Sequence, residues 1–393
     1  MTREAVIVAG SRTAVGKSKR GTTRNWRSDD MMASVIENLL NKTEGLSPAD
    51  IDDVIVGCAM PEGTQGLNLA RIAALRAGLP ASIPAMTVNR FCSSGLQTIA
   101  QAAERIIANG ADTIIAGGAE TMSLVPMTGF RFSPNPHMVQ NQPEVYMGMG
   151  MTAENVAEEY EVSRQAQDEF ALRSHLKASK AQREGLFDNE IVPIEIEEVT
   201  VGAEGRQSRA IIFDKDEHIR PGTSLEALAK LKPVFKQDGT VTAGNSSPLS
   251  DGAAGVIIME RRKAEALGLT PILRFVGYSV AGVRPEIMGV GPIAAVPRVL
   301  QRTGINIEDL DIIELNEAFA AQSVAVIREL DFDEEKTNVN GGAIALGHPL
   351  GCTGAKLTVQ IMHDMMRRDL QLGMVTMCIG GGMGAAGIFE RVN

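Results

Sequence analysis

Short apolar runs alternate with helix-like patterns toward both ends of this chain of 393 residues. Such alternation predicts βαβ units arranged around a sheet that is covered on both faces, and therefore an α/β fold. Strands are expected at 6–8, 54–56, 86–88 and 114–116 early in the chain, and at 272–276, 312–315 and 375–379 late in it.

The middle of the chain interrupts this alternation. Residues 123–250 are richer in proline, methionine and charge, and they include a long amphipathic stretch, Arg164–Arg183. A short helix is expected to open at Thr223, with Glu226 in capping-box spacing. We therefore expect an N-terminal half of residues 1–122 plus 251–270, an inserted loop domain of residues 123–250, and a C-terminal half of residues 271–393.

The two halves carry a diffuse internal repeat. The matching segments are 48–55 with 307–313, 88–89 with 339–340, and 114–118 with 377–381. Because three successive elements keep their order, the repeat favours a duplicated fold.

Composition excludes several classes of protein. The formal net charge of −10 and the lack of a dense basic stripe argue against a nucleic-acid partner. The four cysteines lie too far apart for a zinc knuckle or a disulfide framework, so reduced thiols are expected. No apolar run reaches the roughly 18 residues that a membrane crossing needs, and no secretory leader is evident. We expect a cytoplasmic protein without a membrane partner.

Cys92 stands where the predicted strand 85–88 gives way to a predicted helix, Ser94–Ile107. A thiol at a helix start faces unpaired backbone N–H groups and the positive end of the helix dipole, so its pKa is expected to fall. The alternative is a small, inert core cysteine.

Two further candidates lie in glycine-rich segments near the C-terminus. His348 could accept the proton of a thiol, and pairing it with Cys352 would make a poor zinc site because further ligands are missing. Cys378 ends a predicted strand. The glycines 382–387 satisfy GxGxxG, yet only six residues follow them, so a dinucleotide site is excluded and backbone N–H groups facing an oxyanion are favoured.

Asn316 follows the predicted strand 312–315 and heads a helical pattern. It could be an ordinary N-cap. An asparagine at the carboxyl end of a strand in an α/β fold also lies where ligand sites gather.

Four segments together resemble the thiolases, in family order over nearly the whole chain. They are NRFCSSG (89–95), NEAFA (316–320), GGAIALGHP (341–349) and CIGGGMG (378–384). The resemblance implies a duplicated thiolase fold, with a five-layered α-β-α-β-α core and an inserted loop domain. It also implies a homodimer or homotetramer.

The resemblance assigns catalytic roles as well. Cys92 would be the acylated nucleophile, His348 its activator and Cys378 the second acid/base. Asn316 would hold a water that joins His348 at the thioester oxygen, and the N–H groups of Cys92 and Gly380 would form the other oxyanion hole. No metal, nicotinamide or flavin is implied, and coenzyme A is a substrate.

Coenzyme A would lie along the segment 241–252, with Arg220 at its nucleotide end, where a fixed cation suits phosphate. Each of these positions also has an ordinary surface or core explanation. The predicted binding residues are Met149, Arg220, Phe235, Ala243, Ser247, Leu249, Ala318 and Phe319.

One position departs from the short-chain acetoacetyl-CoA thiolases, because Gly148 stands where they have a histidine. The chain therefore looks more like the degradative 3-ketoacyl-CoA thiolases, which cleave 3-oxoacyl-CoA with coenzyme A. The alternatives are an acetoacetyl-CoA acetyltransferase that condenses two acetyl-CoA molecules, a ketosynthase-like condensing enzyme, and a catalytically silent lipid-CoA carrier. Intact Cys92, His348 and Cys378 argue against the last two.

Overall fold

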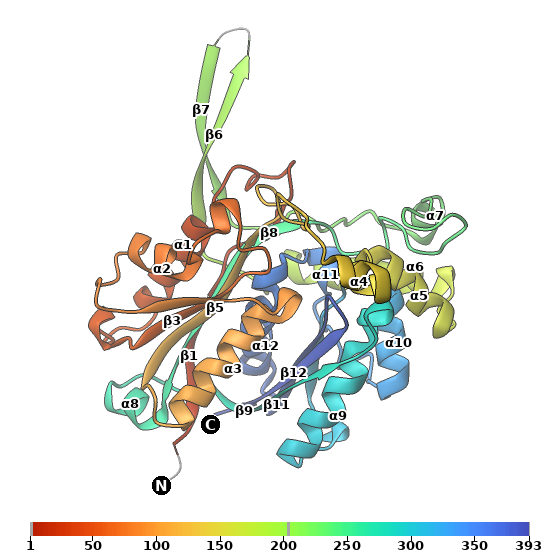
Figure 1. The fold of residues 1–393 in the computed structure, drawn as a ribbon. Coiled ribbons are helices and arrows are strands. Elements are labelled where there is room, and N and C mark those ends of the chain that lie inside the picture. The colour runs from red at the N-terminus through yellow and green to blue at the C-terminus, as the bar shows by residue number, and fades with distance from the viewer. Residues whose placement is uncertain (1–2, 203–204, 393) are drawn as a thin grey trace.

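The computed structural model describes residues 3–202 and 205–392. Within them lies a ten-stranded sheet in the order β10-β11-β12-β9-β1-β8-β5-β3-β4, with β2 paired to β8 (Figure 1). The strands of its N-terminal half are β1 (Ala5–Arg12), β2 (Gly16–Lys17), β3 (Asp53–Gly57), β4 (Ala85–Val88), β5 (Thr113–Thr121) and β8 (Ser250–Glu260). Those of the C-terminal half are β9 (Leu273–Gly282), β10 (Ile312–Leu315), β11 (Leu372–Ile379) and β12 (Met383–Arg391). All seven strands expected from the apolar runs are confirmed.

The two halves of the sheet repeat one pairing scheme. The order β1-β8-β5-β3 is matched by β9-β12-β11-β10, and in both series the first two pairs are antiparallel and the third is parallel. A capped 3-10 turn precedes both β3 and β10, with Ser47 and Asn306 as the capping residues. A short pairing of β1 with β9 joins the halves. The predicted duplication is confirmed.

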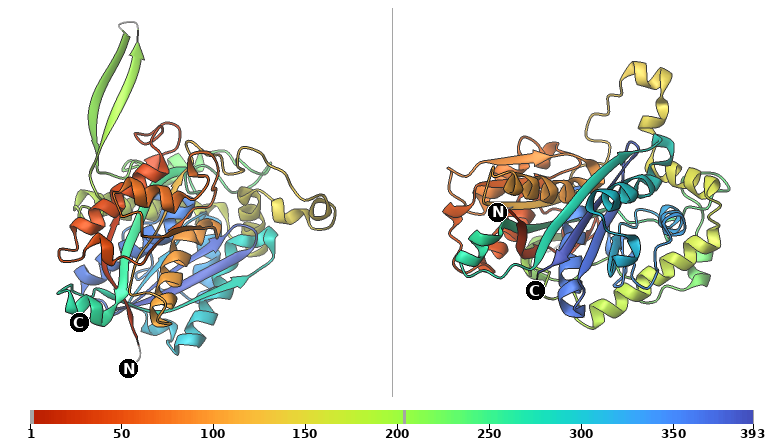
Figure 2. Two further views of the ribbon diagram at one scale, coloured as in Figure 1. Left: turned by 60° about the vertical axis from the view of Figure 1, so that its left-hand side comes forward. Right: turned by 90° about the horizontal axis from the view of Figure 1, so that it is seen from below.

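Helices form three layers around the two halves of the sheet, as Figures 1 and 2 show together. The outer face of the N-terminal half is covered by α1 (Ser28–Asn41), α2 (Leu69–Arg76) and α8 (Arg261–Ala266). Between the halves lie α3 (Ser94–Ile107) and α12 (Leu350–Arg368). The outer face of the C-terminal half is covered by α9 (Gly291–Thr303) and α10 (Ala320–Leu330). The five-layered core is therefore confirmed.

The two central helices approach each other at two glycines. A Cβ atom on Gly95 would lie 2.6 Å from the backbone nitrogen of Ala355, and one on Gly354 would meet the backbone of Leu96. Only a residue without a side chain permits such contact between two backbones. Because Gly95 is the second residue of α3 and Gly354 the fifth residue of α12, the N-terminal ends of the two helices are brought together.

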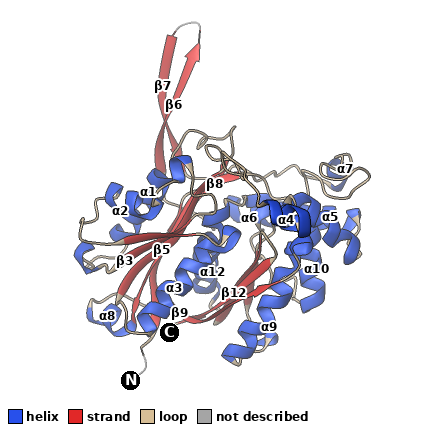
Figure 3. Cartoon of the chain, viewed as in Figure 1, coloured by secondary structure: helices blue, strands red, loops and turns tan. Residues whose placement is uncertain are grey.

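Between β5 and β8 the chain leaves the large sheet. This segment contains α4 (Pro136–Asn141), α5 (Met149–Glu159), α6 (Arg164–Arg183), α7 (Leu225–Ala229), and the hairpin of β6 (Ile194–Gly202) and β7 (Gly205–Phe213). The hairpin projects away from the rest of the molecule (Figure 3). The amphipathic stretch is confirmed as α6. The domain boundaries that we drew remain a prediction.

The helix expected to open at Thr223 begins later. Ser224 is in an extended conformation, and its hydroxyl accepts a hydrogen bond from the backbone of Ala227, so Ser224 is the N-cap of α7. The expected capping box of Thr223 with Glu226 is therefore wrong.

A buried ion cluster fixes the inserted segment to the N-terminal half. The guanidinium of Arg12, on β1, lies 2.8 Å from the carboxylate of Asp216 and 2.7 Å from that of Glu190, and all three side chains are buried. Removing one partner of such a cluster would leave a buried charge unpaired.

None of the helices described combines the length and the apolar character that a membrane crossing requires.

Candidate active site

Cys92 and His348 occupy equivalent places in the two halves. Cys92 lies in the 3-10 turn Phe91–Ser93, which runs directly into α3. His348 lies between the short helix α11 (Ala343–Leu346) and α12. Leu350, in the first turn of α12, packs in one buried cluster with Cys92. The crossing of the central helices thus brings the two segments together.

The turn that carries Cys92 is strained and firmly held. Phe91 has a φ of 42°, in the left-handed region, which costs a residue with a side chain about 1–3 kcal/mol. The side chain of Asn89 accepts from the Phe91 N–H at 2.8 Å, and the Ser94 hydroxyl donates to the Phe91 carbonyl at 2.7 Å. These bonds keep Cys92 at the start of α3.

The protonation state of Cys92 differs from the expectation. Burial raises the pKa of its thiol to about 11, although the backbone N–H groups of Gly380 and of Cys92 itself act on the sulfur and lower the pKa. The N–H groups favour the thiolate as expected, but loss of solvation outweighs them. The predicted lowering of the pKa is therefore wrong, and the substrate-free site holds a neutral thiol.

His348 is buried and neutral. Burial, with a smaller effect from Lys356, lowers the pKa of its imidazole to about 3. Its Nδ1 atom lies 2.6 Å from the Thr353 hydroxyl, and its Nε2 atom lies 3.3 Å from the amide nitrogen of Asn316. Its backbone N–H donates to the Ser250 hydroxyl at 3.1 Å. An uncharged imidazole with one nitrogen free of a proton can act as a base.

Asn316 joins this imidazole from the C-terminal half of the sheet. It directly follows β10, and its backbone N–H donates to the Thr376 carbonyl on β11 at 3.0 Å. Helix α10 begins at Ala320, so the N-cap alternative for Asn316 is excluded. Its Oδ1 atom is buried and has no hydrogen-bond partner among the described residues. A buried polar atom of this kind points to a ligand or water site.

Cys378 lies near the end of β11 and is fully buried. Burial and the proximity of Cys92 raise the pKa of its thiol well above the usual value, so it too is a protonated thiol. Gly380 lies just beyond the strand, and its backbone N–H group is near enough to the sulfur of Cys92 to lower the pKa of that thiol. The two cysteines and the two N–H groups predicted for the oxyanion hole therefore converge.

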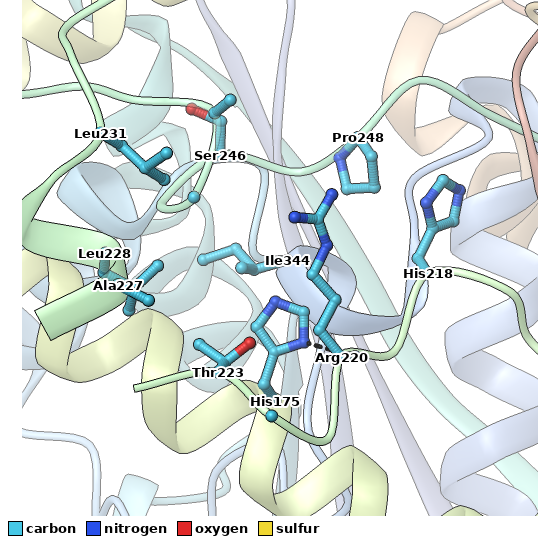
Figure 4. A pocket seen from close by; sticks show the side chains of 13 residues that line it. His175, His218, Arg220, Thr223, Ala227, Leu228, Leu231, Ser246, Pro248 and Ile344 are labelled. Carbon is cyan, nitrogen blue, oxygen red and sulfur yellow. Dashed lines mark hydrogen bonds between the residues drawn. The ribbon is translucent and has the colours of Figure 1, made fainter. Parts of the chain in front are cut away.

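A second feature is a cavity of about 310 Å³, a volume typical of small-molecule sites (Figure 4). It is linked to His348 through Ser250, whose hydroxyl accepts from the His348 N–H and lies 3.1 Å from Nε2 of the lining residue His218. Two of the predicted coenzyme A residues, Arg220 and Ala243, line the cavity. The loop that carries Ala243 is held by a buried carboxylate, because Glu154 on α5 accepts from the N–H groups of Thr240 and Val241. The other lining residues are His175, His218, Gly222, Thr223, Ala227, Leu228, Leu231, Gly244, Ser246, Pro248 and Ile344.

The remaining predicted residues divide into two groups. Met149, Ala318 and Phe319 pack around Cys378, and the ring of Phe235 meets Phe319 edge to face with centroids 6.2 Å apart. Ser247 and Leu249 alternate along the chain with Ser246 and Pro248, which line the cavity. The Ser247 N–H donates to the Ala318 carbonyl at 3.0 Å, and the Leu249 side chain is 47% exposed. Met149, Phe235, Ala318 and Phe319 thus form an apolar wall beside Cys378.

Sequence reasoning missed His175 and His218. Figure 4 shows His175 beside Arg220, whose backbone N–H donates to Nδ1 of His175 at 3.3 Å. Burial lowers the pKa of both histidines to about 4, so both are neutral. His218 could have been found because it is two residues from Arg220. His175 lies on α6, and none of its neighbours in the sequence indicates that it lines the cavity.

Among the residues described, no cluster of histidine, cysteine or carboxylate side chains is arranged to hold a metal ion.

Comparisons with known proteins agree with this arrangement. The family model of the N-terminal thiolase domain matches residues 5–262, and that of the C-terminal domain matches residues 269–391. A 3-ketoacyl-CoA thiolase of Bacillus subtilis (strain 168) is 55% identical over 389 residues, which are 99% of both chains. An acetyl-CoA acetyltransferase of Pseudomonas aeruginosa is 47% identical over 397 aligned residues, covering 98% of both chains.

A solved structure matches over the whole length. The crystal structure of the acetyl-CoA acetyltransferase of Bacillus anthracis has a TM-score of 0.90 and 42% identity, and covers 100% of this chain and 99% of that one. These matches place the chain among the acyltransferases. It belongs to the thiolase family, as its four motifs predicted.

Proposed function

We propose that this enzyme cleaves 3-oxoacyl-CoA with coenzyme A, giving acetyl-CoA and a shortened acyl-CoA, through an acyl group carried on Cys92. The observation that carries the proposal is the proximity of two buried thiols: Cys378 lies close enough to Cys92 for Cys92 to raise its pKa, and the N–H group of Gly380 lies near the sulfur of Cys92. The neutral His348 lies at the N-terminal end of α12, which meets that of α3, and a cavity large enough for part of a small-molecule substrate lies nearby. We place this reaction in the degradative direction of fatty acid metabolism.

In the first half-reaction His348 takes the thiol proton of Cys92 on Nε2, and the sulfur attacks the C3 carbonyl. The N–H groups of Cys92 and Gly380 stabilise the oxyanion. The C2–C3 bond then breaks. Nε2–H of His348 and a water held by Asn316 stabilise the departing thioester enolate, and the Cys378 thiol protonates its C2 atom. Acetyl-CoA leaves, and the shortened acyl group stays on Cys92.

In the second half-reaction coenzyme A replaces acetyl-CoA. The Cys378 thiolate removes its thiol proton, and the new thiolate attacks the acyl group. Cys92 leaves and recovers its proton from His348, so both cysteines return to the thiol form. The residues present supply every proton transfer, and we propose that no metal, nicotinamide or flavin takes part.

We propose that coenzyme A binds with its nucleotide end at this cavity. Arg220 offers a cation to its phosphates at the outer end. The segment from Ala243 through Ser247 to Leu249 runs beside the pantetheine, whose thiol end reaches the apolar wall of Met149, Phe235, Ala318 and Phe319 next to Cys378. We also propose that the enzyme is cytoplasmic and acts as a homodimer or homotetramer.

A second candidate is the condensing reaction of an acetoacetyl-CoA acetyltransferase, and the names of the relatives from P. aeruginosa and B. anthracis favour it. The two candidates differ in chain length. If cleavage of long substrates is the function, wild-type kcat/KM with coenzyme A should rise gradually from four-carbon to medium-chain 3-oxoacyl-CoA, because each buried methylene adds about 1–3 kcal/mol at best. Activity confined to acetoacetyl-CoA would replace the first proposal by the second.

Gly148 offers a direct test of the acyl pocket. It is the N-cap of α5, beside Met149, whose sulfur lies about 4.0 Å from the Cβ position of Gly380. Its φ of −63° is ordinary, and an added Cβ would meet no atom within 4 Å, so the backbone tolerates a side chain there. Gly148→His is expected to lower kcat/KM roughly 10–200-fold per excluded methylene while sparing the four-carbon substrate.

The matched control is Gly202→His, at the far end of the hairpin, where an added Cβ also meets open space. It should leave the chain-length profile unchanged. A uniform loss in Gly148→His across all chain lengths would contradict a pocket role for this position.

A further inference from the structure

Thr353 completes a directed chain of hydrogen bonds through the imidazole of His348. Its hydroxyl oxygen lies 2.6 Å from Nδ1 of His348 and 2.9 Å from the carbonyl oxygen of Pro349. On the other side of the ring, Nε2 lies 3.3 Å from the amide nitrogen of Asn316. All three side chains are buried, so solvent does not compete for these bonds.

The direction of each hydrogen bond follows from the Pro349 carbonyl oxygen at one end of the chain. A carbonyl oxygen can only accept, so the single hydroxyl proton of Thr353 is donated to Pro349. The hydroxyl oxygen must then accept from His348, which puts the ring proton on Nδ1. Nε2 keeps a lone pair, and Asn316 turns its NH₂ group toward it. The Oδ1 atom of Asn316 is thereby left as an acceptor, in agreement with its lack of a partner among the described residues.

We propose that Thr353 is a positioning residue of the reaction proposed above: its hydroxyl holds His348 in the Nδ1–H tautomer, so that Nε2 keeps a lone pair, which exchanges its bond from Asn316 for the thiol proton of Cys92. The same chain orients Asn316 so that Oδ1 accepts from the water at the thioester oxygen. Thr353 does not itself touch the substrate and acts through His348.

The tautomer matters both before and after proton transfer. Before it, the opposite tautomer would already carry a proton on Nε2, the nitrogen that has to receive one, so His348 could not act as a base from that side. Once Nε2 has taken the thiol proton, the ring is a cation. Its Nδ1–H bond to Thr353 then becomes charge-assisted and stronger. One hydroxyl therefore serves both the neutral and the protonated imidazole.

The tautomer can be measured without substrate. Protein labelled with ¹⁵N in its five histidines would be studied by two-bond proton–nitrogen correlation, and a His348→Asn variant identifies the signals of His348 by their loss. The expected result is a protonated Nδ1 in the wild type and in Thr353→Ser, and a mixture or the Nε2–H form in Thr353→Val. A wild-type His348 with its proton on Nε2 would overturn the proposal, whether or not the enzyme cleaves 3-oxoacyl-CoA.

Kinetics test the consequence. Thr353→Val should lower kcat roughly 10–100-fold, within the contribution of a general base, while KM for coenzyme A changes little. Thr353→Ser should retain most of the activity. The matched control is Thr358→Val on the same helix, because the Thr358 hydroxyl is equally buried and donates to the Gly354 carbonyl at 2.9 Å without contacting His348. Equal losses in Thr353→Ser and Thr353→Val, or in Thr353→Val and Thr358→Val, would show a purely structural role and contradict the proposal.

Discussion

Cys92→Ser is expected to abolish both cleavage and condensation, with kcat reduced roughly 10⁴-fold or more, as for the loss of a catalytic nucleophile in other enzymes. The imidazole that has to activate residue 92 is a weak base, with a pKa lowered to about 3. Such a base already deprotonates a thiol with difficulty, and a serine hydroxyl is far less acidic than a thiol. The substituted side chain is therefore left in its unreactive, protonated form.

Mass spectrometry identifies the nucleophile directly. Wild-type enzyme mixed with 3-oxoacyl-CoA in the absence of free coenzyme A should carry one acyl group on the peptide that contains Cys92. Cys352→Ser is the matched control, because Cys352 is also a buried free thiol but has no role in the proposed reaction. It should keep its activity and its adduct. An adduct on Cys58 or Cys352 in the wild type would contradict the assignment of Cys92.

Local patterns were sufficient for most of the regular structure. The helices Ser94–Ile107 and Arg164–Arg183 have the expected bounds, because the apolar spacing that predicts them lies within each segment. The repeated order of strands was visible for the same reason. The start of α10 depends on a contact with a segment distant in the sequence. The Ala320 N–H donates to the Asn245 carbonyl, so the residues after Asn316 run alongside that segment before the helix begins.

The chemistry of the site was predicted in outline, but its protonation was not. The position of Cys92 at a helix start can be seen in the sequence, and it favours a thiolate. The burial that outweighs this effect is supplied by Met122 and Leu350, which lie far along the chain. His175 was missed for a similar reason, since it reaches Arg220 only through the fold of the inserted segment.

The second large effect is expected from Cys378, because only carbon–carbon cleavage needs an acid at C2. Cys378→Ala should reduce thiolysis roughly 10²–10⁴-fold, the usual contribution of a positioned acid. Transfer of an acyl group from a simple acyl-CoA to Cys92 requires no proton at carbon, so it should persist at a slower rate. The measurements are CoA-dependent cleavage of 3-oxoacyl-CoA and the mass of the enzyme after incubation with the acyl-CoA alone.

Packing has to be separated from chemistry in this variant. Cys378 is fully buried against Met288 and Ala318, so alanine leaves a small gap, while Cys378→Ser keeps the shape and removes the thiol. Both variants should show the same division between half-reactions if proton transfer is the role of Cys378. Because the raised pKa keeps this thiol protonated at neutral pH, the acid is available when the enolate departs. Equal loss of both half-reactions in the two variants would assign Cys378 to the support of Cys92 instead.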